Sequence, residues 1–265
     1  MPRSGSTLLC NILNMNSNFH ATPTSPLLDV VRNMRSTFSH NFTFKTHNRL
    51  ENVENFKRAT KSFIENYFDP KNEVVFDKSR SWTTNLMLID EILGHKETKV
   101  IWTYRDPVEI VSSIEKRYRD TVMFESIDEA AGADFSTLGA RVDTFIRDGG
   151  IVADPVWMLE DAINMGYGDR IMIVRYGDLC INTQSVMENI HSFIDEPLYK
   201  YDKYGFSDLT QSTFEFDGLY NYKFSHDIKE GSIKYVKHDV ILTERHIENI
   251  NQRFSWINSL AMNIS

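Results

Sequence analysis

The sequence predicts an α/β protein in which a parallel β-sheet lies between two layers of helices. Three short runs rich in Val, Ile and aromatic residues, at residues 73–77, 99–104 and 170–176, have the composition of buried strands. Helical patterns separate these runs, and strands that alternate with helices pair in parallel. Ligands of such sheets bind beyond the carboxyl ends of the strands, so the chemistry is expected just after the three runs.

The other elements are expected to be helices joined by turns. A first apolar helical run covers residues 8–13, and further helices are predicted at residues 27–38, 50–68, 82–93, 107–119, 138–147, 155–165, 184–194 and 243–260. Gly94 is expected to end one helix as a C-cap, and Pro107 to begin the next. Residues 16–26 have the composition of polar turns, and residues 121–136 and 195–239 have no regular pattern.

Length and composition indicate one soluble globular domain spanning residues 1–265. Apolar residues make up 41% and charged residues 25% of the chain, the usual balance for such a domain. The net charge of −8 argues against a general nucleic-acid binder, whose affinity depends on clustered Lys and Arg. Cys10 and Cys180 give neither a disulfide framework nor metal-ligand spacing, so we expect buried thiols in the cytoplasm. An apolar run of about 18 residues is lacking, so no transmembrane helix is predicted.

The first residues have the composition of an anion-binding loop. Gly5, Ser6 and Thr7 supply small side chains and backbone amides where the apolar run begins, and Arg3 adds a cation. The phosphate-binding loop of NTPases, Gly-x-x-x-x-Gly-Lys-Ser/Thr, ends similarly, but Ser6 stands at its lysine position. Because that lysine contacts the outer phosphates, the substitution argues against ordinary ATP or GTP chemistry. The alternative interpretation is a Ser/Thr-rich N-cap of an ordinary helix.

The position of this loop leads to an expectation about the sheet. In nucleotide-binding α/β folds the loop follows a buried strand, whereas only Met1 and Pro2 precede Arg3. Without that strand the centre of the sheet would have two unpaired edges. We therefore predict a three-layer, P-loop-like fold whose first strand is missing from the N-terminus of this sequence and lies upstream of Met1.

A residue suited to anion binding follows each predicted strand. Lys78 follows the first strand, Arg105 the second, and Tyr176 the third, and Ser113 lies about two turns into the helix after Arg105. Because the carboxyl ends of parallel strands meet at one edge, these side chains and Arg3 are expected to line one crevice.

These strand-end residues also have structural alternatives. Lys78 could be a solvated lysine, Arg105 could pair with Asp106 or Glu109, and Tyr176 could be a packing residue. The strand-end pattern alone does not choose between a ligand site and these alternatives.

Four segments together resemble the sulfotransferase family. They are residues 2–9, similar to its phosphosulfate-binding loop, residues 77–80, residues 104–107 with Ser113, and residues 174–179. Order and spacing agree over residues 1–194, and the likeness is to the broad bacterial, phage and Golgi-related branch. The resemblance implies transfer of a sulfuryl group from 3′-phosphoadenosine 5′-phosphosulfate (PAPS) to a hydroxyl or amine acceptor, with no metal required.

The resemblance also gives each residue a role. Arg3, Ser4, Gly5, Ser6 and Thr7 would hold the phosphosulfate, Lys78 would contact the leaving oxygen, Arg105 and Ser113 would select the 3′-phosphate, and Tyr176 would contact the adenine. Related enzymes take a catalytic Glu or His from the region after the first helix. That region contains His20 and no carboxylate before Asp29, so His20 is the candidate base, with an ordinary loop histidine as the alternative.

Two other functions stay open at this point. A small-molecule kinase of the same fold family would require ATP and magnesium, and a non-catalytic relative would keep only the nucleotide site. Residues 229–234 lie where related enzymes fold a late loop over the nucleotide. The acceptor is expected to contact residues 38–49, 121–136 and 206–224, which carry no readable signature. No oligomeric state is predicted.

Overall fold

The computed structural model describes residues 1–22, 24–46, 48–69, 71, 73–120, 134–201, 233, 235 and 239–263. The late loop expected at residues 229–234 and the acceptor segment expected at residues 206–224 lie outside these residues, as does most of the irregular segment at 121–136. No helix in the described ranges is both long enough and apolar enough to cross a membrane.

The described strands form two parallel pairs. Strand β1 (Phe19–Ala21) pairs with β2 (Val74–Phe76), and β3 (Val100–Tyr104) pairs with β4 (Ile171–Arg175). The register places Phe19 opposite Val74 and Tyr104 opposite Arg175. The predicted parallel pairing is confirmed, and the described strands form two separate hydrogen-bonded pairs.

Helices make up most of the remaining described chain. They are α1 (Ser6–Leu13), α2 (Leu27–His40), α3 (Phe42–Thr46), α4 (Arg49–Glu65), α5 (Leu86–Leu93), α6 (Pro107–Asp120), α7 (Leu138–Ile146), α8 (Ala153–Ala162), α9 (Tyr176–Ile181), α10 (Thr183–Ile194), α11 (Glu244–Arg253) and α12 (Ser255–Asn263). Short helical turns cover Thr83–Asn85, Ile163–Tyr167 and Gly168–Arg170.

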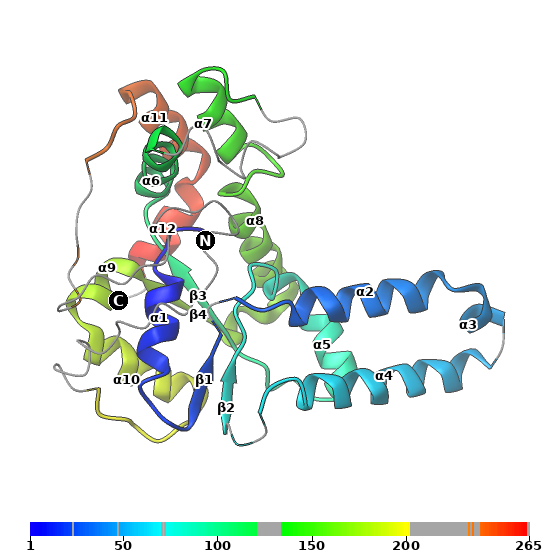
Figure 1. Ribbon diagram of the computed structural model, residues 1–265. Coiled ribbons are helices and arrows are strands. Elements are labelled where there is room, and N and C mark those ends of the chain that lie inside the picture. Colours follow the sequence, from blue (N-terminus) through cyan, green and yellow to red (C-terminus); the bar gives the residue numbers. More distant parts are fainter. Residues whose placement is uncertain are drawn as a thin grey trace.

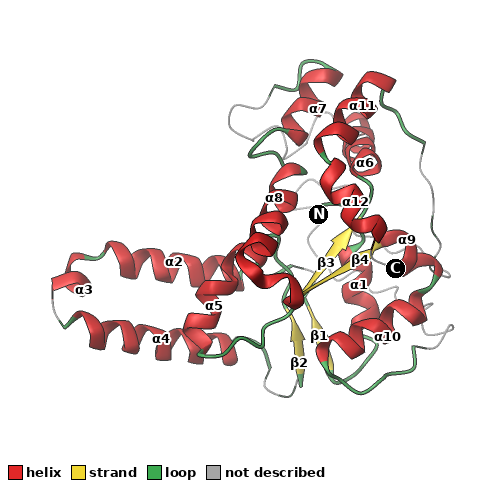
Figure 2. Ribbon diagram, turned by 180° about the vertical axis from the view of Figure 1, so that it is seen from behind, coloured by secondary structure: helices red, strands yellow, loops and turns green. Residues whose placement is uncertain are grey.

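Helices cover both faces of the β3–β4 pair (Figures 1 and 2). Trp102 and Ile173 face a core built with α6, α7, α8, α11 and α12. Val174 and the neighbouring Met172 face a second core built with α1, β1 and α10. Alternate residues of a strand point to opposite faces, so this pair is the centre of three layers.

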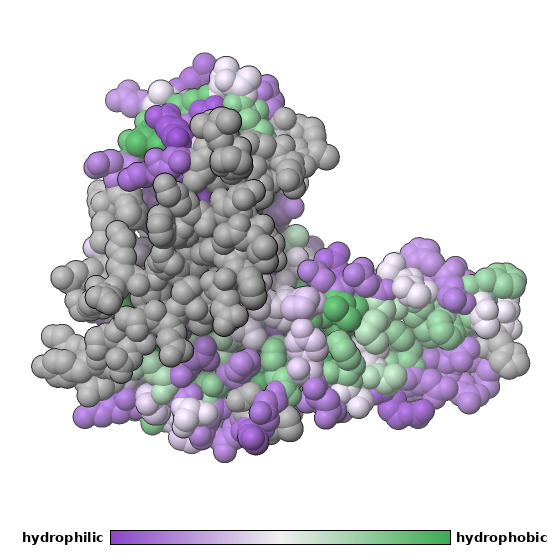
Figure 3. Space-filling model, in the orientation of Figure 1, coloured by the Kyte–Doolittle hydropathy of each residue, from purple (hydrophilic) through white to green (hydrophobic). Residues whose placement is uncertain are grey.

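Helices α2, α3 and α4 form an arm that projects from this body (Figure 1). At its base, Leu27 and Val31 of α2 are buried against Ile89 and Ile92 of α5. Farther out, an apolar strip on the arm stays visible between hydrophilic margins (Figure 3). The arm therefore has a buried root and a partly exposed apolar seam.

Three differences from the expected elements have local causes. Strand β1 lies where polar turns were predicted, because three residues are too few to show a period. The helix expected at residues 243–260 is two helices, with Phe254 at φ −105° and ψ 19° between them. Helices α3 and α9, of five and six residues, were not predicted for the same reason of length.

Candidate functional site

The N-terminal loop turns sharply into α1. Gly5 has φ 87° and Arg3 has φ 54°, both in the left-handed region. Glycine adopts this conformation without a steric penalty, whereas Arg3 is held there at a cost. The turn leaves Gly5 at the N-cap of α1, which has no side-chain cap hydrogen bond. The backbone amides of the first turn therefore face a position where an anion could accept from them.

Ser4 anchors this loop to the sheet. Its side chain is fully buried, and its hydroxyl lies 2.6 Å from the Met1 carbonyl oxygen and 2.6 Å from the hydroxyl of Thr103 on β3. The Ser4 hydroxyl thus serves the fold. Any contact of Ser4 with a ligand would come from its backbone.

Arg105 is a buried cation with one unused nitrogen. It follows β3, is 8% exposed, and its Nε donates to Glu109 Oε2 at 2.8 Å. Its Nη1 donates to the Arg3 carbonyl oxygen at 3.3 Å, and its Cζ lies 4.8 Å from the centre of the Tyr176 ring. Its Nη2 is buried and has no hydrogen-bond partner among the residues that the structure describes. A buried N–H of a cation without an acceptor is costly, and an anionic oxygen would satisfy it.

Tyr176 covers the loop from the end of β4. A Cβ atom placed on Gly5 would come within 2.4 Å of Tyr176 Cδ2, so only glycine allows this approach. The Tyr176 ring also lies 5.9 Å from that of Tyr235. Burial raises the pKa of the Tyr176 hydroxyl to about 12, so this group is neutral at physiological pH. The predicted convergence of Arg105 and Tyr176 on the loop is what the structure shows.

Ser113 reaches the loop through Arg3. Ser113 lies on α6, and its hydroxyl accepts from the Nε of Arg3 in the loop at 3.5 Å. Arg105 was expected to share a phosphate with Ser113. It also contacts Arg3, because its Nη1 donates to the Arg3 carbonyl oxygen. The two predicted phosphate residues therefore flank Arg3.

Lys78 follows β2 and makes hydrogen bonds to Thr22, just after β1, and to Thr7 of α1. Its ammonium donates to the Thr7 hydroxyl at 3.2 Å, and its backbone N–H donates to the Thr22 hydroxyl at 3.1 Å. Thr22 in turn donates its backbone N–H to the Phe76 carbonyl oxygen at 2.9 Å. Burial lowers the pKa of the Lys78 ammonium, and the nearby Arg80 cation acts in the same direction. Lys78 is half-buried and its ammonium is hydrogen-bonded, so it is not a fully solvated lysine.

His20 lies on β1, two residues before Thr22, which accepts from the Lys78 backbone. It is the middle residue of β1, and its neighbours Phe19 and Ala21 face the core on the opposite side of the strand. Its half-buried ring lies 5.4 Å from that of Phe68, at the root of the arm. Asp29 is an exposed residue of α2, as expected for a surface carboxylate.

The pairing of Arg105 with Glu109, named among the structural alternatives, is present, whereas Thr22 and Tyr235 were not assigned from the sequence. Glu109 accepts from Arg105 and also from the Tyr235 hydroxyl at 2.8 Å. The spacing of four residues between Arg105 and Glu109 is a signal for such a pair on a helix. Thr22 and Tyr235 lie in turn-like sequence, where nothing distinguishes a supporting hydroxyl from a solvated one. In the part of the chain that the structure describes, no group of three or more His, Cys, Asp or Glu side chains could hold a metal.

Comparisons with known proteins identify the family and the fold. The family model described as "Sulfotransferase family" matches residues 1–200. The solved structure titled "Sulfotransferase Domain from the Curacin Biosynthetic Pathway" is 15% identical with a TM-score of 0.52, covering 96% of this chain and 95% of its own. The sulfotransferase domain of the Synechococcus PCC 7002 olefin synthase is 17% identical with a TM-score of 0.49, over 97% and 92% of the two chains. No match was found among curated protein sequences. The first of these structures shows a shared fold.

Proposed function

Since the chain belongs to the sulfotransferase family, we propose that it transfers a sulfuryl group from PAPS to an acceptor hydroxyl or amine. The family match and the fold support a transferase with an α/β fold. We further propose the donor, the P-loop-like binding of its phosphates and the roles of single residues.

The unpartnered Nη2 of Arg105 carries the proposal. It is a buried cationic N–H, and the Arg3–Ser113 hydrogen bond and the Tyr176 ring lie beside it. We assign it to the 3′-phosphate of the nucleotide, because a phosphate oxygen satisfies both its charge and its hydrogen bond. The 3′-phosphate is also the group that separates PAPS from ATP. The Tyr176 ring, next to the loop, would contact the adenine.

The other end of the site suits the phosphosulfate. The first amides of α1, at Gly5, Ser6 and Thr7, and the Arg3 side chain would hold it without a metal. When bound, PAPS supplies the sulfuryl group. Lys78, which the Thr7 hydroxyl holds beside these amides, would stabilise the charge that develops on the leaving oxygen.

His20 is the proposed base. An imidazole can accept a proton, and His20 lies on β1 two residues before Thr22, the residue that holds the Lys78 backbone. Because the His20 ring lies beside Phe68, proton transfer would take place on the side of the site that faces the arm.

The state of the two thiols supports a proposal for the location in the cell. Cys10 and Cys180 are free and buried. Burial raises the pKa of the Cys10 thiol to about 11, which keeps it protonated and unreactive. Free, unreactive thiols suit a reducing compartment, and we place the enzyme in the cytoplasm.

Calorimetric titration with adenosine 3′,5′-bisphosphate, the product nucleotide, tests this proposal. We expect micromolar binding without metal, and much weaker binding of ATP with magnesium. Tight binding of ATP–magnesium alone would assign a kinase instead. Failure of the chain to bind either nucleotide would overturn the donor assignment.

A further inference from the structure

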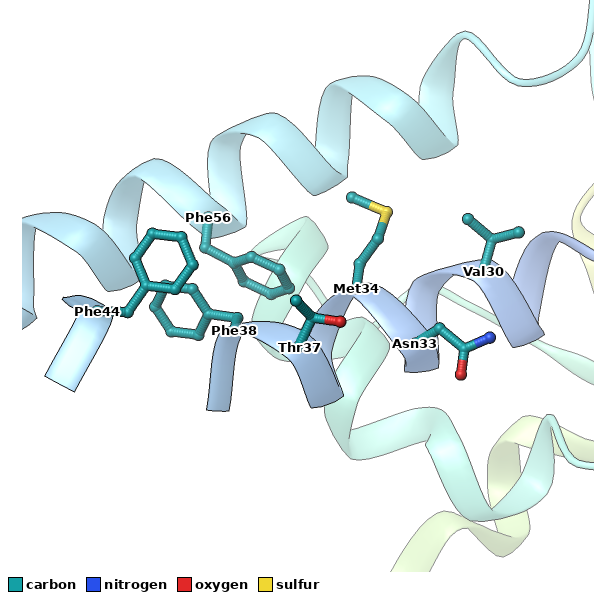
Figure 4. Close-up of a pocket in the computed structure, with 7 residues that line it drawn as sticks. All are labelled: Val30, Asn33, Met34, Thr37, Phe38, Phe44 and Phe56. Carbon is teal, nitrogen blue, oxygen red and sulfur yellow. The ribbon is translucent and has the colours of Figure 1, made fainter. Parts of the chain in front are cut away.

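The arm carries a groove along its apolar seam. The groove has a volume of about 460 Å³ and is lined by Val30, Asn33, Met34, Thr37, Phe38, Phe44 and Phe56 (Figure 4). The α2 residues among these recur at a spacing of three and four, which places them on one face of the helix. Five apolar side chains with one amide and one hydroxyl form the kind of lining that binds an apolar ligand with few polar contacts.

A series of aromatic contacts connects this groove with the proposed base. The ring of Phe68, which lies against His20, is 4.8 Å from that of Tyr67, and Tyr67 is 5.5 Å from Phe63. Phe56 lies seven residues before Phe63, two turns along the same face of α4. These contacts carry aromatic side chains from the α4 face of the groove toward His20.

The outer end of the strip is also aromatic. Phe56 stacks on Phe38 at 4.6 Å, and Phe38 lies 4.8 Å from Phe44 of α3. Figure 4 shows the three rings grouped at the far end of the groove, with Met34 and Val30 toward the body. An extended chain that starts at His20 would thus meet apolar side chains as far as α3.

The charge of the arm differs in sign from that of the whole chain. Residues 27–65 contain seven Lys and Arg against four Asp and Glu, although the chain carries a net charge of −8. Lys45 and Arg49, on either side of the tip, are exposed. A ligand that follows the groove outward therefore ends in a positive field, which favours an anionic group there.

We propose that the acceptor is an amphiphilic alcohol with a long apolar chain and an anionic far end, and that the arm groove is its binding site. The inference rests on the proposed function. The acceptor oxygen forms a bond to sulfur while the bond from sulfur to the nucleotide's phosphate oxygen breaks. The hydroxyl proton passes to His20, and the nucleotide leaves with the electron pair of the broken bond.

Chain-length dependence of transfer tests the inference. With labelled PAPS as donor, kcat/KM is compared for butanol, docosanol and ω-hydroxydocosanoate, whose chains are long enough to pass the 14 residues of α2. We expect the rate to rise steeply from butanol to docosanol, by up to about fourfold for each methylene that is buried. At low salt ω-hydroxydocosanoate should exceed docosanol, and added salt should reduce that difference. Equal rates for butanol and docosanol, or a neutral chain preferred to the anionic one, would overturn the inference.

A matched pair of variants ties the effect to the groove. Phe42 and Phe44 both lie on the short helix α3 and are exposed, at 77% and 37%, but only Phe44 lines the groove. Phe44→Ser should reduce kcat/KM for ω-hydroxydocosanoate about tenfold and leave butanol unchanged. Phe42→Ser should change neither rate. Equal effects of the two substitutions would contradict the assignment.

Two further measurements, nucleotide binding and sedimentation velocity, separate this inference from its alternatives. Binding of adenosine 3′,5′-bisphosphate should be the same in both variants; if the wild-type chain does not bind it, the proposed function fails and not the groove assignment alone. Sedimentation velocity reports self-association. Association of the wild type that Phe44→Ser abolishes, with unchanged kinetics, would assign the groove to a second copy and overturn the inference.

Discussion

The strand-end site and the arm groove are built in opposite ways. Around the N-terminus of α1, the guanidinium of Arg105 is held by a carboxylate, a carbonyl oxygen and an aromatic ring, and it is 8% exposed. In the groove, the rings of Phe38 and Phe44 lie 4.8 Å apart, and Phe44 is 37% exposed. Directional, charged contacts dominate the first region and non-directional apolar contacts the second.

This difference suggests a division of labour. Fixed charges and hydrogen bonds discriminate strongly, because a ligand that lacks a matching group leaves buried polar atoms unpaired. Apolar contacts add affinity with surface area and discriminate weakly between similar chains. We therefore expect strict recognition of the donor nucleotide at the strand ends and permissive recognition of the acceptor along the arm.

The largest effect is expected from Lys78→Met. The substitution removes the cation that the Thr7 hydroxyl holds beside the loop, so sulfuryl transfer should fall by about 10²–10³-fold. Binding of the product nucleotide should weaken far less. Lys71→Met removes an exposed lysine and serves as the control. Transfer at the wild-type rate in Lys78→Met would contradict the role given to this lysine.

Alanine substitutions at Gly5 and Gly94 compare the effect of packing in the site with the effect of backbone strain elsewhere. Gly5 and Gly94 have similar φ values of 87° and 77°, but a Cβ on Gly5 meets Tyr176 whereas a Cβ on Gly94 meets nothing within 4 Å. Gly94→Ala should lower the free energy of unfolding by about 1 kcal/mol, from backbone strain alone. Gly5→Ala should cost about 2–3 kcal/mol in urea unfolding and weaken nucleotide binding as well. Equal losses for both variants would show that the Tyr176 ring moves away freely.

Thr22 is expected to act by positioning Lys78. Thr22→Val removes the hydroxyl that accepts from the Lys78 backbone N–H, and transfer should lose about tenfold in kcat with KM for PAPS nearly unchanged. Thr22→Ser keeps the hydroxyl and should restore kcat. If the serine variant is as slow as the valine variant, the methyl group and not the hydroxyl is what matters.

The smallest effect concerns pH. Because burial lowers the pKa of Lys78, its ammonium loses its proton at a lower pH than the value of about 10.4 for an ordinary lysine. Transfer should therefore decline on the alkaline side before an exposed lysine would titrate. Lys78→Arg keeps its charge, so its activity, though lower, should stay flat over that pH range. The same alkaline decline in Lys78→Arg would point to another group.

Much of the fold could be predicted because the long elements carry a clear period. The helix expected at residues 107–119 is Pro107–Asp120, and Gly94 is the left-handed C-cap of α5 as expected. Strand β1 was not found, because the three residues Phe19–Ala21 form a strand only through their pairing with β2. Tertiary pairing of this kind leaves no local pattern.

The sequence predicted which residues lie near the loop better than it predicted the hydrogen bonds that they make. Strand ends in a parallel arrangement must meet, so Arg105 and Tyr176 could be placed together from the sequence, and they lie in contact. Sequence gave no reason to expect that Ser4 would be buried as an anchor or that Ser113 would bond to Arg3. The groove on the arm depends on how α2, α3 and α4 pack against each other, and residues 38–49 alone carry no sign of it.

The central claim is that Arg105 Nη2 receives the 3′-phosphate of the donor nucleotide. The most direct test is the pair of dissociation constants for adenosine 3′,5′-bisphosphate and AMP, measured by calorimetry for the wild type and for Arg105→Ala, with Arg32→Ala on the arm as the control. The wild type and Arg32→Ala should prefer the bisphosphate by about ten- to a hundredfold, and Arg105→Ala should bind both nucleotides equally. A preference that survives in Arg105→Ala, or that is absent from the wild type, would contradict the claim.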